Sequence, residues 1–132
     1  MMYFLDTNTV IDAFNGRGGV AERLLATKPA EVAIPAIVLY ELWVGVEKAP
    51  RPEPHRRRVT ELVDLVTVVP FGAEAAGVAA RVRAELEGLG NAIGPHDVLI
   101  AATAIAEGGV LVTRNTREFS RVPQLRLESW AE

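Results

Sequence analysis

Met2-Tyr3-Phe4-Leu5-Asp6-Thr7-Asn8, near the start of the chain, is a short apolar run closed by three polar residues. The run has the length and hydrophobicity of a buried strand, and the polar residues favour turns and helix caps. Similar strand-like runs recur at Glu31–Ile34, Val66–Val69, Val110–Val112 and Leu125–Leu127. Helix-like stretches separate them, which implies right-handed parallel crossovers. We therefore predict an α/β fold, with a mostly parallel sheet of four to five strands and helices on both faces.

The predicted helices between these strands have ordinary lengths. They cover Val10–Phe14, Val20–Ala26, Pro35–Glu47, His55–Asp64, Ala73–Glu87 and Pro95–Gly108. The stretches Arg51–Pro54 and Gly88–Gly94 are rich in proline or glycine and predict irregular connections. Gly16-Arg17-Gly18-Gly19 lacks the Gly-Lys-Ser/Thr ending of a phosphate loop, so we interpret it as a flexible turn.

The composition is typical of one compact domain, which we predict over residues 1–132. Of these residues 49% are hydrophobic and 23% are charged, and the net charge is −3. The absence of cysteine excludes disulfides, thiolate metal sites and thiol nucleophiles. Because no apolar run reaches the ~20 residues that a membrane helix needs, and no signal peptide is visible, we expect a cytoplasmic protein that does not enter a membrane.

Three acidic residues are candidates for a functional site. Asp6 follows the first strand directly, at the sheet edge where α/β proteins bind ligands. Asp97 lies in the first turn of the helix that begins at Pro95. Both positions also suit an acid that only caps a helix. Glu41 is unusual because it lies within the apolar stretch Ile37–Val44, where a buried carboxylate needs a cation or a hydrogen-bond network; the alternative is a narrow exposed edge of the helix.

Together the three acids predict a site for a hard divalent cation. Mg²⁺ and Mn²⁺ prefer oxygen ligands and retain several waters, so two to four carboxylates are enough. Such an ion activates a bound water and stabilises the charge of a phosphoryl group. No Ser-His-Asp arrangement competes with this interpretation, and His55 and His96 lack zinc-type spacing. We expect a capping or solvent-exposed role for His96.

The chain resembles the PIN-domain ribonucleases, and within them the VapC-type toxins of toxin–antitoxin pairs, in segments that follow the family order. These segments are Phe4–Asn8 (FLDTN), Val38–Leu42 (VLYEL), His96–Ala102 (HDVLIAA) and Leu111–Phe119 (LVTRNTREF), with the tail Val122–Trp130. The resemblance implies a three-layer α/β fold and RNA cleavage by a water that Mg²⁺ or Mn²⁺ activates. It also implies a small antitoxin partner and a homodimer.

The resemblance also assigns site residues. Asp6, Glu41 and Asp97 match the metal-site acids of the family and, with Glu118, are the predicted catalytic residues. Asn8 is expected to orient an acid or a water.

The segment after the fourth strand departs from the common family pattern. Where many relatives carry Asp, this chain has Asn115, and Glu118 matches the acid of relatives that share this Asn. Whether Asn115 or Glu118 completes the site is left open, and Thr113 is expected to orient an acid or a water. Arg114 and Arg117 lie beside these residues in the sequence and are predicted to bind RNA phosphates.

Charge and apolar patterns leave further interpretations open. Without Asp6, Glu41 and Asp97 the acidic and basic residues balance, so the net charge does not argue against RNA. For the arginines at 56–58, solvated surface side chains are at least as good an interpretation as RNA binding. Trp43 and Val46 suit either the core or a groove for an antitoxin helix.

Two other functions are alternatives for this sequence. A receiver-type signalling module needs an acidic pair after the first strand and a late lysine, whereas here only Asp6 follows that strand and no lysine follows Lys48. A PIN scaffold that has lost catalysis, or a housekeeping protein of RNA processing, is the second alternative. Asn115 favours loss of catalysis, and the three acids oppose it.

Overall fold

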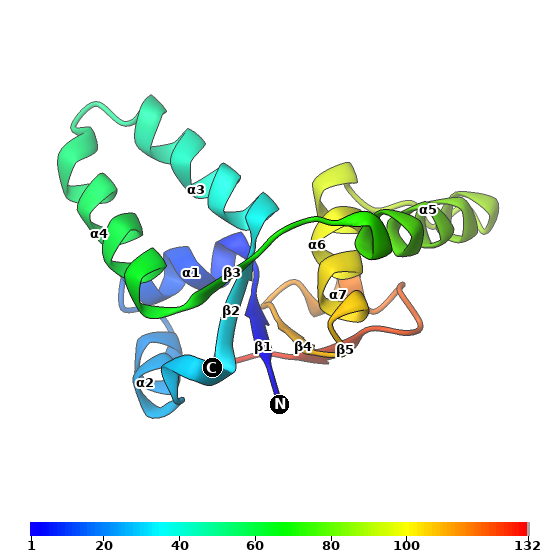
Figure 1. The fold of residues 1–132 in the computed structure, drawn as a ribbon, viewed down its shortest axis with the longest axis horizontal. Coiled ribbons are helices and arrows are strands. Elements are labelled where there is room, and N and C mark those ends of the chain that lie inside the picture. The colour runs from blue at the N-terminus through cyan, green and yellow to red at the C-terminus, as the bar shows by residue number, and fades with distance from the viewer. Residues whose placement is uncertain (132) are drawn as a thin grey trace.

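The computed structural model describes residues 1–131, which form one parallel sheet with helices around it (Figure 1). The strands are β1 (Tyr3–Leu5), β2 (Val32–Pro35), β3 (Thr67–Val69), β4 (Val110–Val112) and β5 (Arg126–Glu128). The helices are α1 (Thr7–Phe14), α2 (Val20–Ala26), α3 (Ala36–Lys48), α4 (Pro52–Leu65), α5 (Ala73–Gly88), α6 (Pro95–Ala106) and α7 (Thr116–Phe119), with a 3₁₀ turn at Pro29–Glu31.

The sheet has the strand order β3-β2-β1-β4-β5, and every pair of neighbours is parallel. In Figure 1, α1 to α4 lie on one side of the sheet and α5 to α7 on the other. This arrangement confirms the predicted α/β fold. The chain builds outward from β1 to β3 and then crosses to the opposite side at β4. The order therefore reverses between β1 and β4, and in such sheets ligands bind beyond the strand ends at this point.

Local sequence explains where the helices begin. Helix α1 begins at Thr7 rather than at Val10, because the side chain of Asp6 caps it. Helix α4 begins at Pro52, since proline suits the first turn, where no intrahelical N–H bond is lost. Pro35 ends β2 instead of opening α3. The short helix α7 occupies a segment for which the sequence predicted no helix.

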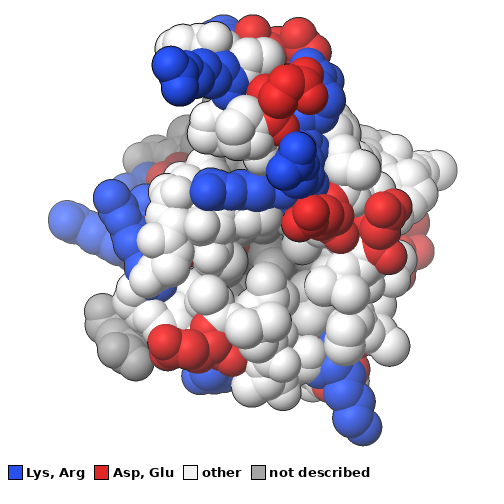
Figure 2. Space-filling view, turned by 90° about the vertical axis from the view of Figure 1, so that its left-hand side faces the viewer, with Lys and Arg blue, Asp and Glu red and all other residues white. Residues whose placement is uncertain are grey.

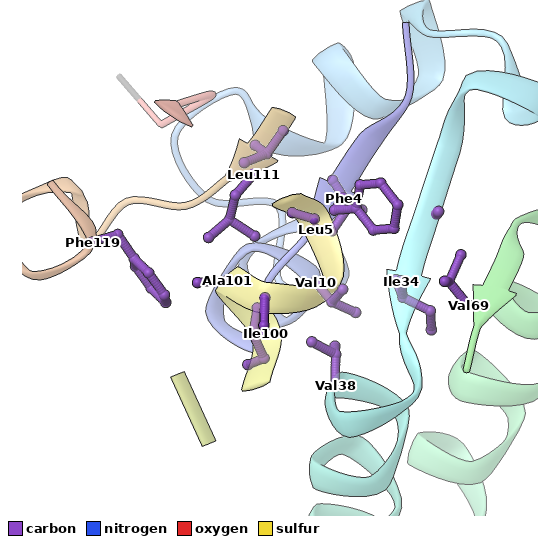
Figure 3. Close-up of a cluster of buried hydrophobic side chains, with 14 of the residues drawn as sticks. Phe4, Leu5, Val10, Ile34, Val38, Val69, Ile100, Ala101, Leu111 and Phe119 are labelled. Atoms are coloured by element: carbon purple, nitrogen blue, oxygen red, sulfur yellow. The ribbon is translucent and has the colours of Figure 1, made fainter. Parts of the chain in front are cut away.

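The core lies on both faces of the central strands (Figure 3). Phe4 of β1, Ile34 of β2 and Leu111 of β4 are fully buried, as are Val38 of α3 and Ile100 of α6. Burying a side chain of this size stabilises the fold by roughly 1.5–3 kcal/mol. The packing fixes the strand ends that carry the candidate site. None of the helices within residues 1–131 combines the length and the hydrophobicity that crossing a membrane requires.

Candidate active site

The candidate site lies where the strand order reverses. Asp6 directly follows β1, and Thr113 directly follows β4. The two strands are in register, with Leu5 paired to Val112, and the Asp6 N–H donates to the Val112 carbonyl at 3.2 Å. The sheet therefore places residues 107 positions apart in the sequence side by side.

Asp6 is buried and performs two structural tasks. One carboxylate oxygen accepts the Thr9 N–H at 2.8 Å and so caps α1, while the other accepts the Thr113 hydroxyl at 2.5 Å. Burial raises the pKa of Asp6, and the hydrogen bonds from Thr113 and Thr9 oppose that rise. The cap and the ligand interpretations of Asp6 are therefore compatible, because the capping carboxylate lies within the cluster of acids.

Glu41 of α3 is joined to two other helices. Its Oε1 accepts the Thr7 hydroxyl of α1 at 2.7 Å, and its Oε2 lies 3.5 Å from Nδ1 of His96 in α6. Its side chain is partly buried, so the network expected for this carboxylate is present. His96 is half-exposed but faces Glu41, a contact that its sequence position did not predict. Thr7 was also not predicted, although it stands next to Asp6 in the quoted motif.

Glu118 of α7 is fixed by two donors. The Gly94 N–H donates to Oε1 at 3.1 Å and the Asn115 side-chain amide donates to Oε2 at 2.8 Å. These two hydrogen bonds lower the pKa of Glu118. The backbone N–H of Asn115 donates in turn to the Thr113 hydroxyl at 3.0 Å. Asn115 thus holds Glu118 in place and links it, through Thr113, to Asp6.

Asp97, in the first turn of α6, is half-buried among the other acids. Burial is the largest cause that raises its pKa to about 6, and the negative charge of Glu118 is the next. The charges of Glu41 and Asp6 raise it further. The structure therefore brings the other three predicted acids within electrostatic reach of Asp97: Asp6 from the end of β1, Glu41 from α3 and Glu118 from α7. Their roles as metal ligands and catalysts stay predictions.

The raised pKa of Asp97 predicts a pH-dependent stability. Between its ordinary value of 3.8 and about 6, the folded chain binds more protons than the unfolded chain, so the free energy of unfolding falls as pH rises. Without metal, Asp97→Asn should be more stable than the wild type by about 1 kcal/mol at about pH 7.5, allowing for solvent screening, and by nothing below about pH 4. Urea unfolding in EDTA measures this. Asp64→Asn, the same change on exposed α4, is the control, and equal stabilities of wild type and Asp97→Asn at the higher pH would contradict the account.

The carboxylate ligands of this cluster fit Mg²⁺ better than a metal, such as structural zinc, that protein side chains surround completely. Within residues 1–131, no group of three or more Asp, Glu or His side chains is arranged to hold a metal ion. A structural zinc site needs four such ligands, whereas Mg²⁺ keeps several waters and binds through one or two carboxylates. The mutual repulsion that raises the pKa of Asp97 is what a bound cation would relieve.

The remaining predicted residues lie around this cluster. Arg114, between Thr113 and Asn115, pairs with Asp12 of α1, with 3.4 Å between Nε and Oδ2. Arg117 is exposed on α7. Asn8 is also exposed, and its side chain makes no hydrogen bond to any residue in the described part of the chain, so the structure does not join it to an acid.

Comparisons with known proteins agree with this geometry. The PIN domain family matches residues 3–125. The chain is 39% identical to Ribonuclease VapC2 of Rickettsia felis over 98% of both chains, and 34% identical to the tRNA(fMet)-specific endonuclease VapC of Shigella flexneri over 99% of both.

Solved structures resemble it equally well. The promoter-DNA-bound VapBC2 structure of Rickettsia felis contains a chain with a TM-score of 0.91 and 38% identity, covering 98% of this chain and 99% of that one. The DNA-bound VapBC of Salmonella typhimurium contains one with a TM-score of 0.92 and 34% identity, over 99% of both. The chain therefore belongs to the PIN domain family and, within it, to the VapC ribonucleases.

Proposed function

We propose that this protein is a Mg²⁺-dependent endoribonuclease, the toxin of a toxin–antitoxin pair, which hydrolyses RNA phosphodiester bonds. The observation that carries the proposal is the cluster of four acids at the reversal of the sheet, in which the pKa values of Asp6 and Asp97 are raised. Relatives that span nearly the whole chain are named ribonuclease or tRNA(fMet)-specific endonuclease, which supports RNA as the substrate.

In this proposal the metal would bind among Asp6, Glu41 and Asp97, through one or two of these carboxylates and several waters. Mg²⁺, or Mn²⁺ in its place, would lower the pKa of a bound water and neutralise charge on the phosphoryl group. Thr113 fixes the orientation of Asp6, and Thr7 fixes that of Glu41, through the hydrogen bonds described above. Both carboxylates are thereby pre-organised before the substrate arrives.

Glu118 is proposed to act on the attacking water. Its carboxylate is ionised near neutral pH and is able to accept a proton, and the hydrogen bonds that lower its pKa also make it a weaker base than a free Glu. As a proton of the water passes to Glu118, the water oxygen would form a bond to phosphorus, one ester P–O bond would break, and the leaving oxygen would take a proton from solvent water. Asn115 would serve this step indirectly, because its amide holds Oε2 of Glu118.

Incubation with bulk tRNA tests the proposal. We expect cleavage with Mg²⁺, no cleavage in EDTA, and recovery when Mg²⁺ is added in excess. Cleavage that persists in EDTA would contradict the metal-dependent mechanism.

An absence of cleavage with RNA binding retained would favour the catalytically inactive scaffold, whereas cleavage without any growth effect in cells would favour a housekeeping nuclease. Light scattering of the purified chain tests the predicted homodimer.

An apolar groove lies on the side of the sheet that carries α1 to α4, and Glu41 of the acid cluster also lines it. It has a volume of about 250 Å³ and runs between α1, α3 and α4. Its apolar lining includes Ile11, Phe14, Leu42, Val46 and Val59. Figure 2 shows the left-hand side of the view in Figure 1, where charged side chains of both signs surround a mainly uncharged middle. The solved relatives described above are toxin–antitoxin complexes, and we propose that this groove receives an apolar segment of the antitoxin.

Of the two α3 residues that were candidates for such a groove, Trp43 and Val46, only one lines it. Val46 lines the groove, but Trp43 does not; it packs partly buried against the core. Ile11, whose exposed fraction is 40%, is the position to change, because its side chain reaches the groove from α1 without forming the core. We expect Ile11→Glu to weaken the affinity for a cognate antitoxin at least about 10-fold. Unchanged affinity, measured by calorimetry, would place the antitoxin elsewhere; Leu89→Glu, at an exposed position after α5, is the matched control.

A further inference from the structure

Asp12 is a buried carboxylate that the proposed chemistry does not use. Its side chain is 4% exposed and lies in the second turn of α1. Its Oδ2 faces Nε of Arg114 at 3.4 Å, and its Oδ1 has no hydrogen-bond partner among residues 1–131. A buried charge with so few partners is costly, and an apolar residue would pack there at a lower cost. Such a residue calls for a functional explanation.

Arg114, the partner of Asp12, lies at the edge of the acid cluster. It follows Thr113, whose hydroxyl donates to Asp6, and its positive charge opposes the burial that raises the pKa of Asp6. The side chain is 45% exposed. The ion pair joins its Nε to Asp12, and none of its guanidinium nitrogens, the two terminal ones included, makes a hydrogen bond within the described part of the chain. A guanidinium in this state retains the pair of donors that binds a phosphate bidentately.

Helix α1 makes Asp12 a fixed point. The Asp6 cap holds the beginning of the helix, and the Thr9 hydroxyl donates to the Val112 carbonyl of β4 at 2.9 Å. The ion pair then connects this anchored helix to the segment between β4 and α7. An arginine held at its Nε loses less conformational entropy when its terminal nitrogens bind a ligand.

We propose that Asp12 is a positioning residue that holds Arg114 beside the acid cluster, where the guanidinium binds a phosphate of the RNA. The proposal rests on RNA being the substrate. It assigns different tasks to the two arginines predicted to bind RNA: Arg114 is fixed in place by a buried carboxylate, whereas Arg117 lies exposed on α7 without an ion pair among the described residues.

Binding of a short fluorescein-labelled oligouridylate, measured by anisotropy in EDTA at several salt concentrations, tests this proposal. Arg114→Gln should weaken binding about 10-fold and reduce the slope of log K against log salt by about 0.7, the loss of one phosphate contact. Asp12→Asn should weaken binding severalfold in the wild type but add nothing to Arg114→Gln, since it acts through that residue. Arg114→Lys, which keeps the charge but not the fork, should retain the salt slope and only part of the affinity.

Several results would overturn the proposal. If Asp12→Asn changes the melting temperature but neither the affinity nor the salt slope, the pair only stabilises the fold. If Asp12→Asn fails to fold, Arg114→Gln decides alone, and wild-type affinity and slope in that variant contradict the proposal. Arg81→Gln, which removes the same charge from exposed α5, is the control and should bind like the wild type.

The proposed nuclease function fails separately. Because EDTA prevents metal-dependent cleavage, the binding measurement does not depend on catalysis. If the protein binds RNA through Arg114 but does not cleave it, the proposed role of Asp12 stands and the proposed nuclease function is contradicted. If it cleaves RNA while Asp12→Asn leaves binding unchanged, the opposite holds.

Discussion

Asp6→Asn should reduce RNA cleavage at least about 100-fold while the protein remains folded. Loss of a residue that only supports a metal ligand costs about 10–100-fold, and Asp6 is proposed to be a ligand itself. The variant removes the negative charge at the centre of the cluster, where the sheet order reverses. The measurement is the initial rate of tRNA cleavage with saturating Mg²⁺.

The structure explains why this substitution separates catalysis from folding. Asparagine caps a helix about as well as aspartate, so its carbonyl is able to accept the Thr9 N–H that Asp6 accepts now. Its amide group is able to donate to the Thr113 hydroxyl, which is free to reorient. The melting temperature should therefore not fall, because burial already raises the pKa of Asp6 and disfavours its charge. Asp64→Asn on exposed α4 should cleave normally; near-wild-type cleavage by Asp6→Asn would contradict the site assignment.

Gly109→Ala should destabilise the fold by about 3 kcal/mol or more, which corresponds to a decrease of at least about 10 °C in melting temperature. Gly109 directly precedes β4 and passes close to β1. A Cβ atom there would lie 2.5 Å from Cε2 of Phe4 and 2.8 Å from the carbonyl oxygen of Met2. Phe4 is fully buried, and the Met2 carbonyl accepts the Val110 N–H at 3.0 Å, so neither group moves without loss of core packing or sheet pairing.

The matched control for this prediction is Gly77→Ala. Gly77 lies in the middle of α5, is exposed, and has nothing within 4 Å of an added Cβ. The same methyl group should therefore stabilise the protein by about 0.5–1 kcal/mol, because alanine favours the helix. Urea unfolding of both variants measures the difference. If Gly109→Ala is as stable as the wild type, the close contact of Gly109 with Phe4 and the Met2 carbonyl is contradicted.

The fold and three of the four acids could be predicted because their signals are local in the sequence. Each strand is a short apolar run with a turn residue after it, and strand ends meet at one edge of a parallel sheet. Asp6 is predictable for that reason. Glu41 is predictable because a charge within an apolar helix needs partners. The order of the strands, which places β4 beside β1, is not visible in any single segment.

The unpredicted features all depend on contacts between distant segments or on short local hydrogen bonds. Asp12 and Arg114 are about 100 positions apart, and neither residue type is unusual where it stands in the sequence. Helix α7 is too short for a periodic pattern. The hydrogen bond by which Asn115 holds Glu118 depends on side-chain geometry, which the sequence does not show. Thr7 stands next to Asp6 in the sequence, and this position is a local signal that its hydroxyl lies near the site.

One cluster of acids is proposed both to bind the metal and to cleave RNA. The most direct test of this proposal measures Mn²⁺ occupancy by electron paramagnetic resonance and tRNA cleavage by gel in the same samples, for the wild type and Asp97→Asn. We predict that occupancy and cleavage rise together with Mn²⁺ in the wild type, and that both are lost together in the variant. A variant that still binds Mn²⁺ and cleaves tRNA like the wild type would contradict the account.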